Sequence, residues 1–266
     1  MTTVAIHQPN FFPWLGFFSK LARADVFLLL DDVQQPRTGR GGWGNRVRLR
    51  FNGEARWWSA PLARGGGVIA VNEQRFADTR WRRKALTSLQ MCYGKATHFQ
   101  AVFPGIQLLI ESEEELIAEF NERAIATIAS WLGLSTELRR TSTLGIETVG
   151  TERLVQLVQG CGGTTYLCGD GSEGYLEEER FQQAGIQLEM MDYQHPTYHQ
   201  GGAPFLAGLS ILDSLFHCGL EQTRALVMAD GPPPTVPMQV RHPSSKPRGL
   251  EEGGGMRKTR PRAPKG

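Results

Sequence analysis

Two short apolar runs near the start of the chain each end abruptly at polar residues. The first covers residues 4–6 and stops at His7, and the second covers residues 26–30 and stops at Asp31. Continuous apolar runs of this length are typical of central parallel strands, which are buried on both faces. Between them, apolar residues return at helical spacing over residues 14–24. The pattern therefore predicts strand, loop, helix and strand, a βαβ unit with a right-handed crossover.

The remaining patterns predict further strands and helices. Residues 45–50 and 56–62 are expected to be the strands of a hairpin, because the Asn52-Gly53 pair between them favours a tight turn. Other elements are expected as helices at 81–92, 113–132 and 151–159, a strand at 165–167, a helix that ends at Gly185, a strand at 187–191, and helices at 210–216 and 221–228. The sequence thus predicts an α/β fold with a Rossmann-like, mainly parallel or mixed sheet and flanking helices. The hairpin favours the mixed form.

Composition and charge separate the body of the chain from its end. Hydrophobic residues make up 40% of the 266 residues, enough for a sizeable core. We expect one α/β domain over residues 1–230 and a disordered tail rich in Pro, Gly and basic residues over 231–266. The formal net charge is +2, but residues 241–266 carry eight Lys or Arg against two Glu, or +6, which leaves −4 for the preceding residues. A mildly acidic body argues against a specific nucleic-acid partner.

The chain shows no sign of export or of membrane insertion. No stretch approaches the roughly 18 consecutive apolar residues of a membrane span, and the N-terminus lacks a signal-peptide pattern. The four cysteines are widely spaced without a CxxC pair, which argues against a zinc ribbon or a disulfide framework. We therefore expect a cytoplasmic protein with a small-molecule substrate. Its cofactor and oligomeric state are left open by the sequence.

Polar side chains gather where the first two strands end. They are His7, Gln8, Asn10 and Lys20 around the first loop and helix, and Asp31, Asp32 and Gln34 after the second strand. In an open parallel sheet, ligands bind outside the carboxyl ends of the strands, so we expect these groups to converge on one crevice. The alternative for any single residue is a local role, in which the aspartates cap a turn and the histidine bonds loop carbonyls.

Three later loops add candidates. Asn45 and Arg46 follow the glycine-rich residues 35–44 and are expected to bind a carboxylate or phosphate, whereas Arg48 and Arg50 are expected to be a solvated strand face. Asp170 and Tyr175 follow the strand at 165–167, where Cys168 is either a nucleophile or, as the stronger alternative, a buried apolar side chain. His195, Tyr198 and Gln200 are expected to face a substrate. The His195 and His199 spacing does not indicate a metal site, because Pro196 disfavours a helix there and no third ligand is evident.

These loops lie in segments that resemble one known family. The motifs of WbqC-like proteins are matched, in order over about residues 4–220, by IHQPNFFPWLGFFSKLARADVFLLLDDVQ, WGNRVR, TRWRRKAL, YGKA, YLCGDGSEGYL, YQHPTYHQ and LSILDSLFHCG. The resemblance implies a bacterial protein of the kind often encoded among O-antigen and other surface-polysaccharide genes. Transfer of an acyl or aminoacyl group to an amino sugar is the usual suggestion for such proteins. The matching positions are His7, Gln8, Asp31, Asp32, Asn45, Arg46, Tyr175, His195, Tyr198 and Gln200.

Two departures and a second, more distant similarity refine this interpretation. The family commonly shows Ser-Gly where this chain has Cys168-Gly169, and this chain has a longer RTGRGG loop before Trp43. The opening of the chain is also similar to HUP-type nucleotidyltransferases and pantothenate synthetase-like ligases, which hold nucleotide phosphates with a HxGH-type motif. Here Leu15-Gly16 lies near the place of the second histidine, so this similarity implies the fold without the adenylate chemistry.

Together these observations favour an acyl- or aminoacyltransferase that acts on an amino group of a small substrate, such as a nucleotide-linked amino sugar. His7 or His195 would accept the proton of the attacking amine, because imidazole titrates near neutral pH. Asp31 or Asp32 would hold the amine or orient the imidazole. Two alternatives stay open: an ATP-dependent ligase or nucleotidyltransferase with Mg²⁺ at the aspartates, and a non-catalytic module that binds a sugar or a protein.

Overall fold

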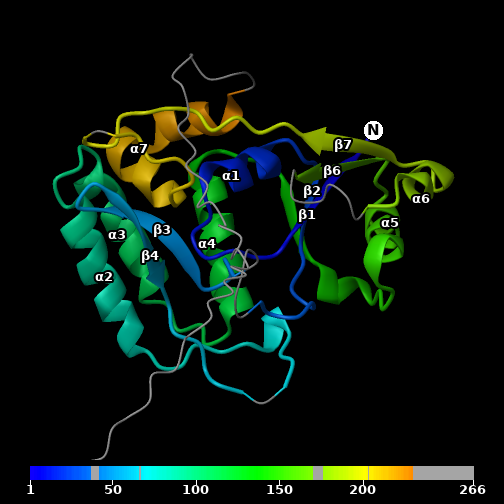
Figure 1. Cartoon of the computed structure of the whole chain (residues 1–266), viewed down its shortest axis with the longest axis horizontal. Helices are drawn as coiled ribbons and strands as arrows, with labels where there is room; N and C mark the ends of the chain where they lie inside the picture. Colours follow the sequence, from blue (N-terminus) through cyan, green and yellow to red (C-terminus); the bar gives the residue numbers. More distant parts are fainter. Residues whose placement is uncertain (37–41, 66, 170–175, 203, 230–266) are drawn as a thin grey trace, which may run out of the picture. The chain divides into compact units, whose positions relative to one another are not determined.

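A five-stranded sheet lies at the centre of the chain, in the order β5-β2-β1-β6-β7 with every neighbouring pair parallel (Figure 1). This computed structural model describes residues 1–36, 42–65, 67–169, 176–202 and 204–229, all within the compact unit Met1–Pro234. The strands of the sheet are β1 (Thr3–His7), β2 (Val26–Leu29), β5 (Glu137–Arg140), β6 (Thr165–Gly169) and β7 (Gln187–Met191). The predicted tail, residues 231–266, lies outside the described residues.

Helices cover both faces of the sheet because successive side chains of the central strands point to opposite sides. In β1, Ala5 joins a core with α1, α4 and α7, whereas Val4 and Ile6 join a second core with α5 and α6. Figure 1 shows these two groups of helices on either side of the strands. The helices are α1 (Leu15–Ala22), α2 (Arg80–Tyr93), α3 (Phe99–Ile110), α4 (Ile117–Trp131), α5 (Gly150–Gly160), α6 (Glu178–Gln183) and α7 (Ile211–Met228), with 3-10 turns η1 (Val71–Glu73) and η2 (Thr141–Leu144). The predicted α/β architecture is confirmed.

The predicted hairpin forms, but it does not join the main sheet. Strands β3 (Arg46–Phe51) and β4 (Glu54–Ser59) pair antiparallel as a separate two-stranded sheet, closed by Asn52 and Gly53 with φ of 50° and 82°. The inward side chains Val47, Leu49 and Trp58 pack into the larger core. The expectation of a mixed sheet was therefore wrong, because the hairpin packs by its apolar face and leaves the main sheet parallel.

Other departures concern elements with weak sequence patterns. The helix α3, which contains Pro104, and the edge strand β5 were not predicted. The two helices expected at 210–216 and 221–228 run on as one segment, α7, with a break at Gly219, where φ is 75°. A Cβ at Gly219 would also lie 2.8 Å from the His98 ring. Glycine is needed there because other residues rarely adopt this conformation.

Candidate functional site

The carboxyl ends of all five parallel strands lie at the same edge of the sheet. The chain moves from β1 to β2 and β5 on one side, and then crosses to β6 and β7 on the other side of β1. This change of direction is a topological switch point, where open α/β sheets bind ligands. His7 is the last residue of β1 and therefore lies at that point.

His7 is a neutral imidazole held in one tautomer. Its Nδ1 lies 2.9 Å from the carbonyl of Gln8, so Nδ1–H donates and Nε2 carries the lone pair. The ring lies between Trp14 and Phe17, with centroids 5.9 and 5.0 Å away. Burial, and then the charge of Lys20, lower the pKa of His7 to about 4. The Lys20 ammonium is itself buried and donates to the carbonyl of Ile6 at 2.9 Å.

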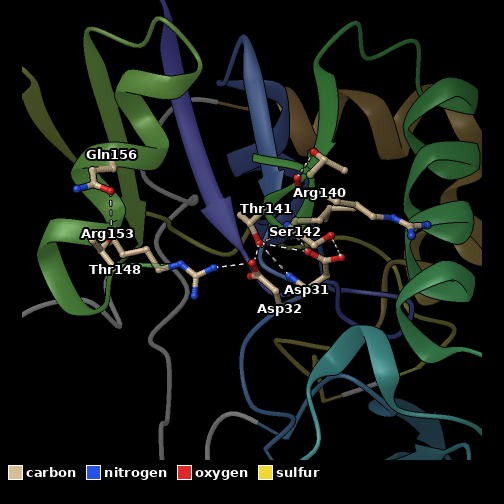
Figure 2. A network of polar contacts seen from close by, with 10 residues as sticks. Asp31, Asp32, Arg140, Thr141, Ser142, Thr148, Arg153 and Gln156 are labelled. Carbon is tan, nitrogen blue, oxygen red and sulfur yellow. Dashed lines mark hydrogen bonds and ion pairs between the residues drawn. The ribbon is translucent and has the colours of Figure 1, made fainter. Parts of the chain in front are cut away.

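Asp31 and Asp32 contact the segment that follows β5, as Figure 2 shows. Asp31 accepts hydrogen bonds from the backbone N and the Oγ of Ser142 at 3.0 and 2.7 Å. Asp32 accepts from Thr141 Oγ1 at 2.7 Å and from Arg153 Nη2 at 2.6 Å. Within the described residues neither carboxylate bonds an imidazole. Their predicted catalytic role stays a prediction, and their contacts hold η2 and α5 against the end of β2.

The loop after β1 is tied to the glycine-rich segment before β3. Asn121 Nδ2 donates to the carbonyls of Pro9 and Gly44 at 2.8 and 2.7 Å. Asn10 is buried beside them at 2% exposure, whereas Gln34 is exposed and pairs through its backbone with Ala70. Gln8 is half-buried next to His7. The structure thus keeps Gln8 and Asn10 near His7 and places Gln34 in a neighbouring turn.

Asn45 and Arg46 begin the hairpin, and their described contacts are within the protein. Asn45 Nδ2 donates to the carbonyl of Ala60 at 2.8 Å, which closes the open end of the hairpin. Arg46 Nε donates to the carbonyl of Gly42 at 2.8 Å, and its guanidinium lies 4.5 Å over the ring of Trp57. Arg46 is therefore a guanidinium held against an indole in a cation–π contact.

His195, Tyr198 and Gln200 lie on the segment 192–210, which we name the His195 loop. His195 repeats the arrangement of His7, since its Nδ1 lies 2.9 Å from the carbonyl of Pro196. Its Nε2 is buried and has no hydrogen-bond partner among the described residues, and the same is true of the hydroxyl of Tyr193. Burial lowers the pKa of His195, and the charge of Arg48 lowers it further. The imidazole is therefore neutral, with its lone pair unused.

Asp213 anchors this loop from the first turn of α7. The Tyr198 hydroxyl donates to Asp213 Oδ2 at 2.9 Å, and the Tyr198 ring stacks with His195 at a centroid distance of 6.4 Å. Burial raises the pKa of Asp213 to about 6, although the hydrogen bond from Tyr198 opposes that shift. Gln200 fixes the loop further along, because its amide pairs with the backbone N and O of Leu206 at 2.8 and 2.9 Å.

Arg48 and Arg50 are not the solvated face that the alternation predicted. Arg48 Nη2 donates to the carbonyl of Gly208 at 3.5 Å, and Arg50 Nη1 donates to that of Pro204 at 2.9 Å. The His195 loop passes over this face of β3, which sequence alternation alone does not reveal. Tyr193 and Arg48 are thus residues that the sequence reasoning left out of the site, whereas Asp213 was expected either to orient a group of this loop or to cap the helix. The one sequence feature that could have indicated Arg48 is that its strand contains no acidic residue to pair with it.

Aromatic contacts connect the two histidines. A Cβ on Gly16 would lie 2.7 Å from the ring of Tyr193 and 2.9 Å from Nε1 of Trp14, so both rings pack against the first turn of α1. Trp14 reaches His7, and the Tyr193 ring lies 5.9 Å from the His195 ring. Glycine at position 16 therefore lets the His195 loop approach His7. His7 and Asp31 follow adjacent parallel strands, but the Asp31 carboxylate faces η2 and bonds neither imidazole among the described residues, so a site shared by all three stays a prediction.

Three predicted candidates are not placed in this site. Asp170 and Tyr175 lie outside the described residues. Cys168 is fully buried among the apolar side chains of the second core, with Sγ 3.3 Å from the carbonyl of Glu189, which supports its structural role. No group of three or more metal-ligating side chains occurs among the described residues. Two shallow cavities, of about 390 and 480 Å³, are lined by other residues, around Lys84 and around Gln222.

Comparison with known proteins places the chain in a family. An uncharacterized protein of Mycobacterium tuberculosis (strain ATCC 25618 / H37Rv), Rv1507c, is 30% identical over 224 residues, which cover 83% of this chain and 96% of that protein. No solved structure gives a significant match. No helix in the described part of the chain is long and apolar enough to cross a membrane. The model of the WbqC-like protein family matches residues 8–225, and the chain belongs to that family.

Proposed function

We propose that the chain is an acyl- or aminoacyltransferase that acts on an amino group of a small substrate, such as a nucleotide-linked amino sugar. The reaction would serve surface-polysaccharide or natural-product biosynthesis. The observation that carries the proposal is His195, a neutral imidazole whose buried Nε2 has no partner among the described residues. A buried lone pair without a donor is costly unless a ligand or water supplies one.

The roles follow from the chemistry of the neighbouring groups. The amine nitrogen attacks the acyl carbonyl carbon, the bond to the leaving group breaks, and the amine proton passes to His195 Nε2 and then to the leaving group. The Tyr193 hydroxyl, which has no hydrogen-bond partner among the described residues, and the Arg48 guanidinium, which contacts Gly208 of the same loop, would be the donors for the oxygen that becomes negative. Asp213 acts through Tyr198, by holding the loop that carries the base.

His7 is the competing base. It has the same tautomer and lies at the switch point, but burial and Lys20 lower its pKa to about 4. A base with so low a pKa holds a transferred proton weakly near pH 7, because efficient general bases have a pKa close to the working pH. We therefore assign the proton transfer to His195 and substrate binding to the surroundings of His7.

Mass spectrometry of reaction mixtures tests this proposal. The protein would be incubated with acetyl-CoA or an aminoacyl donor and a set of UDP- and dTDP-amino sugars, and N-acylated product is expected. His195→Gln should reduce the rate by about 100-fold or more. His199→Ala, an exposed histidine on the same loop, is the matched control and should retain the wild-type rate.

Three results would oppose the proposal in different ways. Loss of activity in His7→Gln with full activity in His195→Gln would assign the role of general base to His7 instead of His195. Thermal stabilisation by ATP with Mg²⁺ alone would favour a ligase. Amino-sugar binding without any product, lost in the His195 variant, would indicate a binding module.

A further inference from the structure

The face of the β3–β4 hairpin that the His195 loop partly covers combines cations with an exposed indole. Arg48 and Trp57 are directly paired across the two strands, so their side chains project from the same face. Arg46 and Arg50 belong to this face because they alternate with the inward Val47 and Leu49. We name this surface the arginine-tryptophan face.

Trp57 is unusually exposed for a tryptophan. Its side chain is 50% exposed, whereas its neighbour Trp58 on the opposite face is 8% exposed and packs in the core. Trp43 lies 5.0 Å from Trp57 between ring centroids and is itself 5.3 Å from Trp14, the ring that reaches His7. An exposed aromatic side chain that continues a row of aromatic rings toward a site indicates a stacking surface.

Arg48 is a guanidinium whose charge no carboxylate in the described part of the chain neutralises. It forms no ion pair with a carboxylate within the described residues, and its Nε is buried without a hydrogen-bond partner. Its one described hydrogen bond goes to the carbonyl of Gly208 at 3.5 Å. Burying a charged guanidinium with an unused N–H donor costs free energy, and an anion that accepts from that donor offsets the cost. Since Gly208 belongs to the His195 loop, an anion bound to Arg48 would lie against the loop that carries the proposed base.

We propose that the arginine-tryptophan face binds a nucleoside diphosphate. The base stacks on the part of the Trp57 ring that the Arg46 guanidinium, 4.5 Å over that ring, leaves open, and the diphosphate accepts hydrogen bonds from Arg48. Stacking on an indole suits a planar base, and a guanidinium binds phosphate oxygens with two donors. The group attached to the diphosphate then points toward His195 Nε2. This inference rests on the proposed function in one respect only: it takes the attached group to be the amine acceptor.

Isothermal titration of the full chain with UDP, ADP and inorganic diphosphate tests the site. Both nucleotides are expected to bind more tightly than diphosphate, since stacking tolerates different bases. Trp57→Ala should weaken UDP binding by about 10-fold or more and leave diphosphate binding unchanged. Arg48→Gln should weaken all three ligands. Arg56→Ala is the matched control, because this arginine is on the opposite face of the same hairpin and pairs with Glu54 at 3.0 Å.

Two results would overturn the inference. One is the absence of saturable binding of UDP and ADP up to about 10 mM. The other is unchanged UDP affinity in both Trp57→Ala and Arg48→Gln, each shown by circular dichroism to be folded. Trp57→Phe, which keeps a smaller ring, should retain part of the affinity and separates loss of stacking from loss of structure.

The outcomes also separate this inference from the transferase proposal. Nucleotide binding that depends on Trp57 and Arg48, without any acyl transfer, would support the nucleotide site and contradict the transferase proposal. The opposite outcome is acyl transfer to an amine that carries no nucleotide, at equal rates in wild type and Trp57→Ala. It would support the transferase proposal and contradict the nucleotide site.

Discussion

At the scale of single residues, burial shifts His7 and Asp213 in ways that affect stability oppositely. The pKa of His7 is about 4 in the folded protein, against 6.5 for an unperturbed histidine as in the unfolded chain. Its contribution to the free energy of unfolding is therefore complete above pH 6.5 and is lost as the pH falls toward 4. Asp213 has a folded pKa of about 6 against 3.8, so its burial destabilises the fold above pH 6 and less so as the pH falls toward 4. Each shift corresponds to roughly 3 kcal/mol at most.

Variants of these two residues should therefore diverge with pH. His7→Gln should destabilise the protein more at pH 7.5 than at pH 4.5, because only the neutral imidazole suits its buried site. Asp213→Asn should gain stability relative to wild type as the pH rises over the same interval, because the amide still accepts from Tyr198 and carries no charge. Urea unfolding at the two pH values measures both differences. Parallel changes in the two variants would contradict this assignment of the shifts.

At the scale of elements, Asp32 and Arg153 join the end of β2 to α5. The two side chains are 23% and 15% exposed, and their ion pair is 2.6 Å long. Arg153→Met should lower the free energy of unfolding by about 1 to 3 kcal/mol, between the values for surface and buried pairs. Arg180→Met is the control, since this arginine is 46% exposed in its pairs with Glu152 and Glu177 and should cost under about 1 kcal/mol. If chemical denaturation gave equal losses in the free energy of unfolding for the two variants, the Asp32–Arg153 pair would contribute no more than a surface pair.

The same scale shows what the sequence could predict. The strands β1 and β2 were predictable because central parallel strands are uninterrupted apolar runs. The edge strand β5, with the sequence ELRR, has one strand neighbour and no such run, and so it carried no signal. The turn of the hairpin was readable from Asn52-Gly53, but the surface on which the hairpin packs was not. Pattern therefore predicts an element better than it predicts the partner of that element.

The candidate site divides in the same way. His7 and Asp31 were predictable as polar residues that follow apolar strands, because the edge of a parallel sheet is a general binding place. Arg48 was assigned to solvent because its contact, the carbonyl of Gly208, lies 160 residues away in the sequence. Asp213 lies in the first turn of α7, where an acidic residue has an ordinary role at a helix N-terminus. Whether Arg48 and Asp213 belong to the candidate site depends on their contacts with an irregular loop, which local sequence patterns do not reveal.

At the scale of the whole molecule, every described strand, helix and apolar core lies within Met1–Pro234. Removal of residues 235–266 should therefore leave the midpoint of thermal unfolding within about 2 °C of the full chain. It should also change the formal net charge from +2 to −4, because the removed residues carry +6.

A deeper truncation provides the contrast, because the core continues to the end of α7. A chain that stops after Leu220 loses the buried Thr223 and Val227 and should unfold several degrees lower. Differential scanning calorimetry of the three chains makes the comparison, and UDP titration of the first truncation shows whether the arginine-tryptophan face needs residues 235–266. A large fall in the midpoint after the first truncation would show that the cooperative unit extends beyond Pro234. A selective loss of UDP affinity would instead give those basic residues a part in binding the diphosphate.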